Sequence, residues 1–177
     1  PKSLITNKKN ILCDYKKIGF PLVAKINSNT VLHKTEIGGV ITNINNEKQL
    51  KQKTNKFKGS ILIEKMITDN VFEMIIGIKN DNQFGPTIIL GAGGIYTELF
   101  KDTTTLLLPL NKKIILQEIK KLKFSKILFG FRGKKGGDVK SLVNIILKIA
   151  KFAEKNSDKV SEVDINPLIV CKKGKGV

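Results

Sequence analysis

Hydrophobic positions along the chain repeat with the spacings of short strands and amphipathic helices. Apolar runs bounded by glycine, proline or polar turns predict strands over residues 22–26, 40–44, 61–66, 71–78, 87–90, 160–165 and 168–171. Apolar residues at helical spacing predict helices over residues 9–18, 46–57, 111–123 and 139–155. Pro167 is expected to interrupt the last strand, and Asp138 is expected to cap the last helix.

The mixture of strands, helices and hairpin-type turns predicts a mixed α/β (α+β) fold. The length of 177 residues suits one domain or two small lobes. A polar stretch near residues 66–70 separates two groups of predicted elements. We therefore expect an N-terminal lobe over residues 1–66 and a C-terminal lobe over residues 67–177.

The formal net charge is +17, but the kind of basic residue argues against nucleic-acid binding. Lysine supplies nearly all of the 32 basic residues, and Arg132 is the single arginine. Base reading and bidentate phosphate binding favour arginine, whose planar group matches both partners. The lysines are scattered among many asparagines and isoleucines, which indicates a compositional bias more than a basic patch. The charge still favours attraction of anionic ligands such as nucleotides.

Cysteine usage and hydropathy indicate a protein without a membrane partner. Cys13 and Cys171 lie far apart and match no zinc or redox spacing, so a reducing, cytoplasmic location is expected. No apolar run approaches the roughly 18 residues of a transmembrane helix. The first residues also lack the apolar region of a signal peptide.

Three oxygen-bearing side chains alternate with apolar ones near the end of the chain. In a strand this spacing places Glu162, Asp164 and Asn166 on one face. Carboxylate and amide oxygens are ligands that Mg²⁺ accepts together with waters and substrate phosphates. The same alternation is also the ordinary pattern of a half-exposed strand, so the spacing leaves both interpretations open.

Three charged residues interrupt apolar strands in the first half of the chain. Lys25 lies within a short apolar run and must reach water or an anion, because burial of an unpaired ammonium is unfavourable. It is a candidate phosphate contact or an edge-strand lysine whose ammonium reaches water. Glu64 and Glu73 are candidates for a ligand cleft or for solvent-facing strand positions.

His33 is the single histidine of the chain and lies in a polar stretch that ends in two glycines. A neutral imidazole, with a pKa of about 6.5, is a competent nucleophile at physiological pH. A surface histidine is the alternative. The run Gly91-Ala92-Gly93-Gly94 follows a predicted strand, where glycines allow close phosphate approach or form a tight turn.

A family resemblance follows from ordered segments that cover nearly the whole chain. The segments are Gly19-Phe20-Pro21-Leu22-Val23-Ala24-Lys25-Ile26, Leu32-His33-Lys34-Thr35-Glu36-Ile37-Gly38-Gly39-Val40, Ile63-Glu64-Lys65-Met66, Phe72-Glu73-Met74-Ile75-Ile76-Gly77, Leu90-Gly91-Ala92-Gly93-Gly94-Ile95, Leu99-Phe100-Lys101-Asp102, Gly130-Phe131-Arg132-Gly133 and Glu162-Val163-Asp164-Ile165-Asn166-Pro167-Leu168. Together they resemble the ATP-grasp region, or β subunit, of ADP-forming acetyl-CoA and related acyl-CoA synthetases. The resemblance implies an ATP-grasp fold of two small lobes with the nucleotide between them.

The resemblance also implies an acid–thiol ligase that interconverts acyl-CoA, ADP and phosphate with free acid, CoA and ATP. A CoA-binding subunit or fused domain is the implied partner, which gives a hetero-oligomer or a multidomain chain that is active only with that part. The implied cofactor is Mg²⁺ with ATP or ADP. The resemblance implies that His33 transfers phosphate and that Lys25 contacts the nucleotide phosphates. It implies that Glu64, Lys65 and Met66 line the adenine pocket and that Glu73 lies near the ribose. Mg²⁺ would be bound by Asn166 together with Asp164 or Glu162.

Two departures from the family pattern keep alternatives open. An arginine is expected a few residues after Lys101-Asp102, and Leu106 stands at the matching position. The family also continues into a further strand with a metal-binding aspartate, which suggests that this chain is a fragment of a longer one. The alternatives are a degenerate ATP-grasp regulatory domain of an acetyltransferase and a β subunit of the succinyl-CoA synthetase type.

Overall fold

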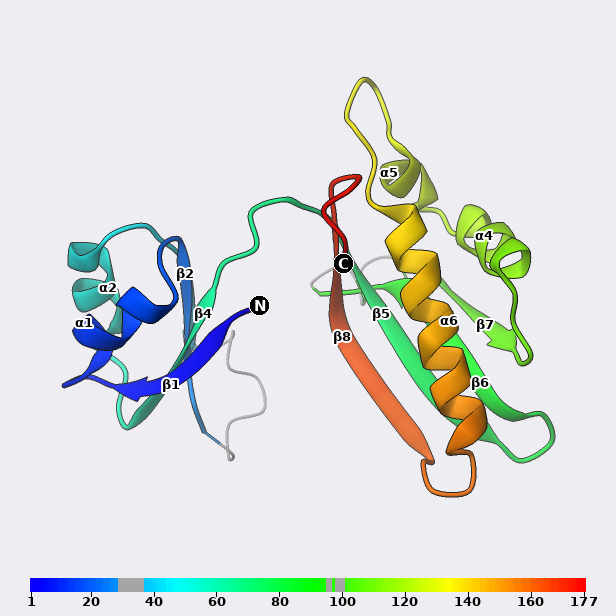
Figure 1. Ribbon diagram of the computed structural model, residues 1–177, viewed down its shortest axis with the longest axis horizontal. Coiled ribbons are helices and arrows are strands. Elements are labelled where there is room, and N and C mark those ends of the chain that lie inside the picture. The colour runs from blue at the N-terminus through cyan, green and yellow to red at the C-terminus, as the bar shows by residue number, and fades with distance from the viewer. Residues whose placement is uncertain (29–36, 95–96, 98–100) are drawn as a thin grey trace. The chain divides into compact units, whose positions relative to one another are not determined.

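The computed structural model describes residues 1–28, 37–94, 97 and 101–177, and it divides the chain into two compact units. The first unit is Pro1–Thr68 and the second unit is Asp69–Val177. Each unit has its own sheet (Figure 1). Each also has its own hydrophobic core. None of the helices in the described ranges is long and apolar enough to span a bilayer.

The first unit is a four-stranded antiparallel sheet in the order β1-β4-β2-β3, with short helices against one face. Its elements are β1 (Ser3–Asn7), α1 (Ile11–Asp14), the 3₁₀ helix η1 (Tyr15–Lys17), β2 (Leu22–Ile26), β3 (Val40–Ile44), α2 (Glu47–Thr54) and β4 (Ser60–Lys65). Alternate residues of β2 and β4 face the helices, and these are buried. The core consists of Ile11, Leu22, Ala24, Ile44, Leu50, Phe57, Ile61 and Ile63.

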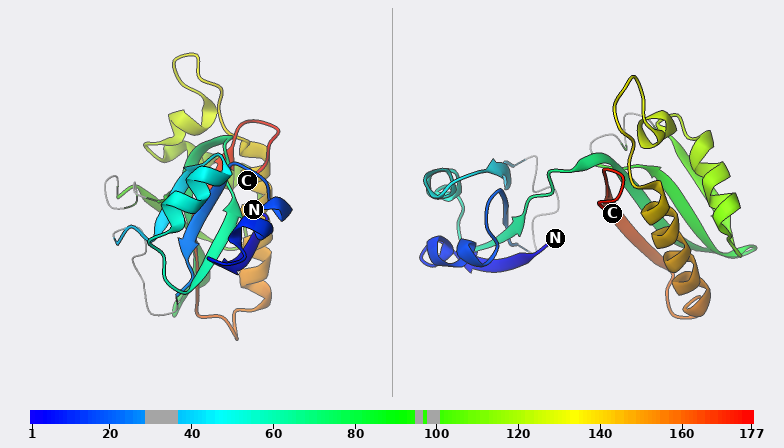
Figure 2. Two further views of the ribbon diagram at one scale, coloured as in Figure 1. Left: turned by 90° about the vertical axis from the view of Figure 1, so that its left-hand side faces the viewer. Right: turned by 45° about the horizontal axis from the view of Figure 1, so that its top comes forward.

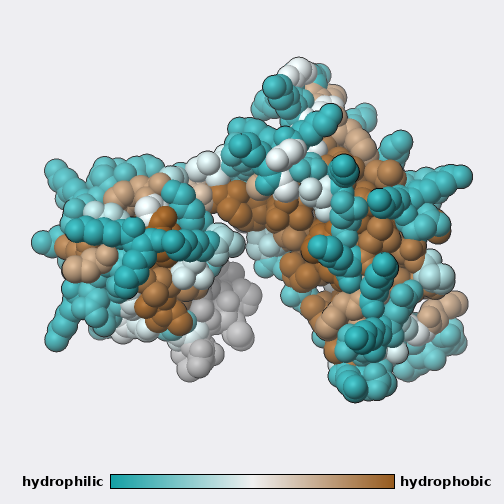
Figure 3. All heavy atoms as spheres, in the orientation of Figure 1, coloured by the Kyte–Doolittle hydropathy of each residue, from teal (hydrophilic) through white to brown (hydrophobic). Residues whose placement is uncertain are grey.

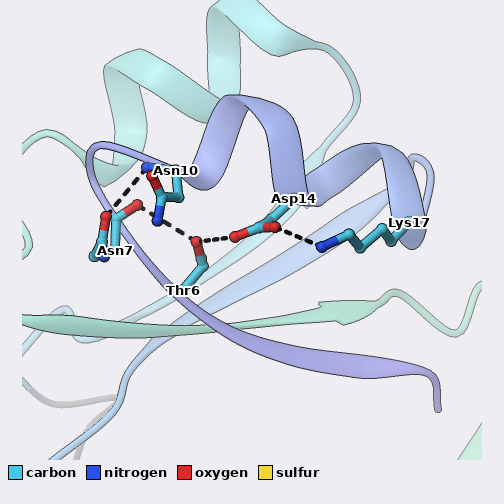
Figure 4. Close-up of polar contacts among 5 residues, drawn as sticks. All are labelled: Thr6, Asn7, Asn10, Asp14 and Lys17. Atoms are coloured by element: carbon cyan, nitrogen blue, oxygen red, sulfur yellow. Dashed lines mark hydrogen bonds and ion pairs between the residues drawn. The ribbon is translucent and has the colours of Figure 1, made fainter.

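Polar contacts around Asp14 hold β1 against the first helix (Figure 4). The hydroxyl of Thr6 donates to the Asp14 carboxylate over 2.7 Å, and the Lys17 ammonium lies 3.0 Å from its other oxygen. The Thr6 hydrogen bond, followed by the one from Lys17, holds the pKa of Asp14 below its usual range. The backbone N–H of Asn10 donates to the Asn7 side chain over 3.1 Å, which closes the turn into α1.

The second unit is also built on a four-stranded antiparallel sheet, in the order β7-β6-β5-β8. Its elements are β5 (Asn70–Asp81), β6 (Gly85–Ala92), β7 (Thr103–Leu107), α4 (Lys112–Lys121), α5 (Ser125–Phe129), α6 (Val139–Lys155) and β8 (Glu162–Cys171). The helices cover one face of this sheet, and the opposite face carries no helix of the described residues (Figures 1 and 2). On the side that carries α6, hydrophobic and hydrophilic residues are interspersed at the surface (Figure 3).

The core of the second unit lies between the sheet and the helices. From β5 it takes Phe72, Met74, Ile76 and Ile78, which alternate with less buried residues. Phe72 stacks on Phe124, with ring centroids 4.5 Å apart, just before α5 begins. Period-two alternation therefore separates a core face of the sheet from an open face.

The predicted mixed α/β architecture is confirmed, and several boundaries agree to the residue. The strands over 22–26 and 40–44 and the helix over 139–155 are β2, β3 and α6. The strand expected over residues 71–78 is longer in the structure, since β5 runs from Asn70 to Asp81. Three elements were not predicted, namely β1, β7 and α5, because β1 and β7 each bury a single residue and α5 is only five residues long.

The prediction that Pro167 interrupts the last strand is wrong. β8 runs continuously from Glu162 to Cys171. It lies at the edge of the sheet, where a residue without an N–H group is tolerated. The pairing with β5 shifts register between Met74 and Ile76, opposite the proline, so a local bulge absorbs the missing ladder bond.

Asp138 joins the start of α6 to the last turn of the chain. As predicted, it caps the helix, since its side chain accepts from the Ser141 N–H over 3.1 Å. Its second oxygen accepts from the N–H groups of Gly174 and Gly176 over 3.1 and 3.0 Å. The donors at Ser141 and Gly176 hold the pKa of Asp138 below its usual range. Asp138 therefore fixes the helix start to residues 174–176.

This depressed pKa predicts an acid-sensitive contribution to stability. Because the folded-state pKa lies below the unfolded value, the contribution is fully present above the unfolded pKa and is lost as pH falls through the folded one. Asp138→Ala is expected to lower stability at pH 7 and to flatten its decline in acid, as measured by urea unfolding across pH. Glu154→Ala, an exposed acidic position on the same helix, is the matched control. An unchanged acid decline in Asp138→Ala would contradict this role.

Candidate functional site

The open face of the first sheet carries an ion pair between two of the predicted site residues. Lys25 on β2 and Glu64 on β4 lie on neighbouring strands, and the Lys25 ammonium contacts the Glu64 carboxylate. Both are at positions that alternate with the buried core residues, so they face away from the helices. The Lys25 side chain is 37% exposed and that of Glu64 is 18% exposed. The glutamate thus holds the ammonium at the surface, where an anion can reach it.

Lys65 is turned to the other side of β4. Its ammonium donates to the carbonyl oxygens of Gly19 and Phe20, with 3.3 Å to the former. The backbone N–H of Met66 donates to the Pro21 carbonyl over 2.9 Å. Lys65 and Met66 therefore hold the loop that leads into β2. Consecutive strand residues alternate in direction, so Lys65 does not join Lys25 and Glu64 on the open face.

The open face of the second sheet carries the acidic residues predicted from β5 and β8. Glu73 lies directly opposite Ile169, and Asp164 lies opposite Gly77. Glu162 is paired with Lys79, a cross-strand neighbour of opposite charge. Asp164, Glu162 and Asn166 are all exposed, while the residues between them pack on the core. The predicted one-sided arrangement of these three side chains is present.

Gly94 is the point at which Glu73 and Asn166 meet. The N–H of Gly94 donates to the Asn166 side-chain oxygen over 3.1 Å, although the two residues are 72 positions apart. The neighbouring N–H of Gly93 donates to the backbone carbonyl of Glu73 over 2.9 Å. A Cβ atom at Gly94 would collide with the Glu73 carboxylate, and Gly94 has a φ of 59°. The glycine is therefore required both by its backbone conformation and by the space that Glu73 occupies.

The donor set around Asn166 suits a hard cation held by few protein ligands. An amide oxygen has two lone pairs, so Asn166 retains acceptor capacity beside its bond from Gly94. Asp164 stands two residues away on the same face of β8. Within the described ranges no cluster of three or more His, Cys, Asp and Glu side chains could hold a metal. Asn166 and Asp164 would by their chemistry suit a Mg²⁺ ion that takes one or two protein ligands and completes its shell with water and phosphate.

Leu106 does not stand on the face that carries these candidates. Its side chain is 2% exposed and belongs to the hydrophobic core, between open-face neighbours Thr105 and Leu107. Leu106 pairs with Ile88, which is also a core residue. A side chain at this position could not reach the open face without leaving the core. The fold therefore places Leu106, which stands where the family pattern has an arginine, away from the open face that carries the candidate residues.

The sequence did not predict which further residues strand pairing brings to the open face of the second sheet. Thr103 and Thr105 on β7 are exposed, and they lie opposite Gly91 and Ile89 on the open face. Gly94 was recognised only as part of a glycine run. His33 and the neighbouring residues of its motif lie outside the described residues.

Burial raises the pKa of the Cys171 thiol, which argues against Cys171 as a nucleophile.

Comparison with known proteins supports, over the whole chain, the family resemblance that the sequence motifs indicate. Residues 1–177 match the ATP-grasp domain family. The chain is 37% identical to the 4-hydroxybutyrate–CoA ligase [ADP-forming] of Nitrosopumilus maritimus, over 99% of this chain and 27% of that protein. It is 34% identical to the acetate–CoA ligase [ADP-forming] II subunit beta of Pyrococcus furiosus, over 91% of this chain and 73% of that subunit.

A solved structure shares both sequence and fold with this chain. The dinucleotide forming acetyl-coenzyme A synthetase 1 of Ca. Korarchaeum cryptofilum superposes with a TM-score of 0.79 at 31% identity, over 98% of this chain and 80% of that one. The chain spans about a quarter of the length of the Nitrosopumilus relative. The ordered sequence motifs, the two antiparallel sheets and the match over residues 1–177 all point to one family. The chain belongs to the ATP-grasp domain family.

Proposed function

We propose that this chain is the nucleotide-binding part of an ADP-forming acyl-CoA ligase, and that it exchanges phosphate between His33 and ADP or ATP. The observation that carries the proposal is the junction at Gly94, where a carboxylate and an amide oxygen meet on the open sheet face. The Pyrococcus relative is named as the β subunit of such a ligase. The Korarchaeum structure is described with coenzyme A, Mg-AMPPCP and a phosphohistidine segment that points towards the nucleotide binding site.

Each of the described candidate residues is assigned one contribution to nucleotide binding. The Lys25 ammonium contacts phosphate oxygens, and Glu64 keeps it oriented through their ion pair. Glu73 accepts hydrogen bonds from ribose hydroxyl groups. Lys65 and Met66 position the loop beside β2 for the adenine.

The metal-binding role falls to Asn166 and one carboxylate of β8. We assign that carboxylate to Asp164, because Glu162 lies opposite the ammonium-bearing Lys79 and is farther along the strand from Asn166. When bound, Mg²⁺ neutralises charge on the phosphate oxygens. Gly94 holds the Asn166 amide in one orientation through its N–H, as outer contacts of metal ligands commonly do.

The phosphate-transfer step requires a nucleophile and electrostatic stabilisation. A neutral His33 nitrogen attacks the γ-phosphorus of ATP, and the bond from that phosphorus to the bridging oxygen breaks. ADP leaves with the electron pair, and the ring loses the proton of its other nitrogen to water. Cations around the moving phosphoryl group supply most of the catalysis in such reactions. The reverse step makes ATP from ADP.

The partner that this function requires is a CoA-binding subunit or fused domain, which would make the acyl phosphate from acyl-CoA and phosphate. A regulatory domain without turnover was an alternative because of Leu106. Since Leu106 lies in the core, no observation in the described residues favours that alternative.

Lys25→Ala is expected to weaken ADP binding in the presence of Mg²⁺. The loss of one charge-assisted phosphate contact amounts to about 1.5–3 kcal/mol, which is roughly a 10- to 150-fold rise in Kd. Isothermal calorimetry with and without Mg²⁺ measures it. Lys51→Ala, on the exposed surface of α2, is the control and should bind as the wild type does. Equal affinities in both variants, with or without Mg²⁺, would refute the assignment of Lys25.

Gly94→Ala tests the junction, and Gly85→Ala is its matched control. Both glycines have positive φ, of 59° and 70°, so each variant should lose about 1–2 kcal/mol of stability. A Cβ at Gly85 meets no atom within 4 Å, whereas at Gly94 it displaces the Glu73 carboxylate. Only Gly94→Ala should therefore lower Mg²⁺-dependent ADP affinity, by about tenfold or more. If both variants retain wild-type affinity, the Gly94 junction is not the nucleotide site.

His33→Asn should abolish phosphorylation of this chain in the complete enzyme. His33 is the single histidine, so no other residue of the chain can become a phosphohistidine. The complete enzyme is incubated with γ-labelled ATP and analysed under alkaline conditions, because phosphohistidine is acid-labile. The variant should lose the label and net acyl-CoA turnover while ADP binding survives. Wild-type turnover in His33→Asn would show that another group carries the phosphate.

A further inference from the structure

A hairpin between α5 and α6 projects from the second unit (Figure 1). Phe131 and Lys134 form an isolated antiparallel bridge, and the Lys134 N–H donates to the Phe131 carbonyl over 3.0 Å. The two residues between them, Arg132 and Gly133, have φ values of 47° and 78°. Positive φ at both central positions is typical of a tight two-residue hairpin turn. The only arginine of the chain thus stands at the tip of a defined turn.

The base of this hairpin is tied to the rest of the unit by backbone hydrogen bonds. The Gly137 N–H donates to the Leu128 carbonyl over 2.8 Å, and the Lys173 N–H donates to the Gly136 carbonyl over 3.3 Å. Gly137 also forms a bridge with Lys172, directly after the end of β8. The hairpin is therefore held in place at its base from two sides.

Exposed apolar side chains accompany the hairpin. Ile127, Phe129 and Phe131 are 42%, 44% and 49% exposed. The guanidinium of Arg132 lies 5.2 Å from the centroid of the Phe131 ring, and the ammonium of Lys120 lies 5.8 Å from that of Phe129. Aromatic residues and arginine together are enriched at the energetic centres of protein–protein interfaces.

The segment that carries the hairpin contributes charge of one sign, although Glu118 pairs with Lys121 and Asp102 accepts from the Lys123 N–H beside it. The stretch from 119 to 137 contains no aspartate or glutamate. Its basic residues are Lys120, Lys121, Lys123, Lys126, Arg132, Lys134 and Lys135. The carboxylate nearest in sequence after the hairpin, Asp138, is buried and already accepts three backbone N–H groups. A partner that covers this surface must supply carboxylates, because buried cations need partners of opposite charge.

The hairpin lies at the end of the second sheet that carries Glu73. Its base is joined to the end of β8, where Cys171 pairs with Asn70, and two residues earlier along β8, Ile169 pairs with Glu73. A hollow lined by Phe129, Lys135 and Asn144, among others, lies beside that base. A protein docked on this end therefore comes close to the candidate nucleotide site.

We infer that the α5 hairpin surface, defined as Ile127, Phe129, Phe131, Arg132, Lys134 and Lys135, is the docking surface for the CoA-binding part of the same enzyme. This inference rests on the proposed function, which requires that part to exchange phosphate with this chain. The docked face of the CoA-binding part presents an apolar hollow for Phe131 bordered by carboxylates, and Arg132 pairs with one of them in bidentate geometry. A protein is favoured over RNA because three apolar side chains are exposed alongside the cations.

The contact is tested by cross-linking in the complete enzyme. A photoreactive phenylalanine replaces Phe131, and the cross-linked peptides are identified by mass spectrometry. The expected product joins position 131 to the CoA-binding part. The same replacement at Phe152, which is 47% exposed towards the other end of α6, is the matched control and should give no such product. Cross-links from position 131 only to RNA, only within this chain, or to nothing would each overturn the inference.

Arg132→Glu in the complete enzyme gives a second, independent readout. The charge reversal should lower acyl-CoA turnover at least tenfold, and Arg132→Lys should lower it less, while ADP affinity and thermal stability of both variants stay at wild-type values. Lys155→Glu, an exposed reversal near the C-terminal end of α6, should leave turnover unchanged. Wild-type turnover in Arg132→Glu would overturn the docking surface alone. Failure of the wild-type chain to bind ADP would instead refute the proposed function.

Discussion

The antiparallel pairing of β5 with two neighbours is the constraint on which the second unit depends. β5 is an inner strand, bonded to β6 on one side and β8 on the other, and its residues 71–78 alternate between the core and the open face. Met74, Ile76 and the other core residues of β5 pack against the helices, so Glu73 lies on the opposite face of the sheet. A slip of one residue would bury the Glu73 carboxylate and expose the core residues, so the packing of α6 and the position of the acidic group are set by one register.

Gly93 and Gly94, which follow β6, connect the paired strands β5 and β8 at one local site. The chain turns after Ala92, and the two following N–H groups reach the backbone of Glu73 and the side chain of Asn166. No other residue type would leave room for the Glu73 carboxylate at Gly94. Three elements that are distant in sequence thus contribute to one polar junction. The first unit presents a simpler arrangement, in which an ion pair across two strands orients Lys25.

The helical side of the second unit exposes aromatic and cationic side chains, whereas the open face of the sheet carries the acidic candidates. The segment from α5 to the start of α6 is fixed by backbone bonds at its base and ends in exposed aromatic and cationic groups. Its rigidity matters, because a preordered surface loses less conformational entropy on association than a disordered one. The overall excess of lysine, which by itself indicated only a compositional bias, here coincides with exposed apolar side chains and the single arginine.

The sequence by itself determined most of the elements, the family and most of the candidate residues, because strand and helix periods and ordered motifs are local properties of the chain. It therefore predicted β2, β3 and α6 to the residue, and it placed Glu162, Asp164 and Asn166 on one face. Only the tertiary structure decided that Pro167 is tolerated on an edge strand and that Leu106 faces the core. It also decided that Asn166 meets Gly94. These outcomes depend on strand order and register, which arise from hydrogen bonds between segments far apart in the chain and leave no trace in local periodicity.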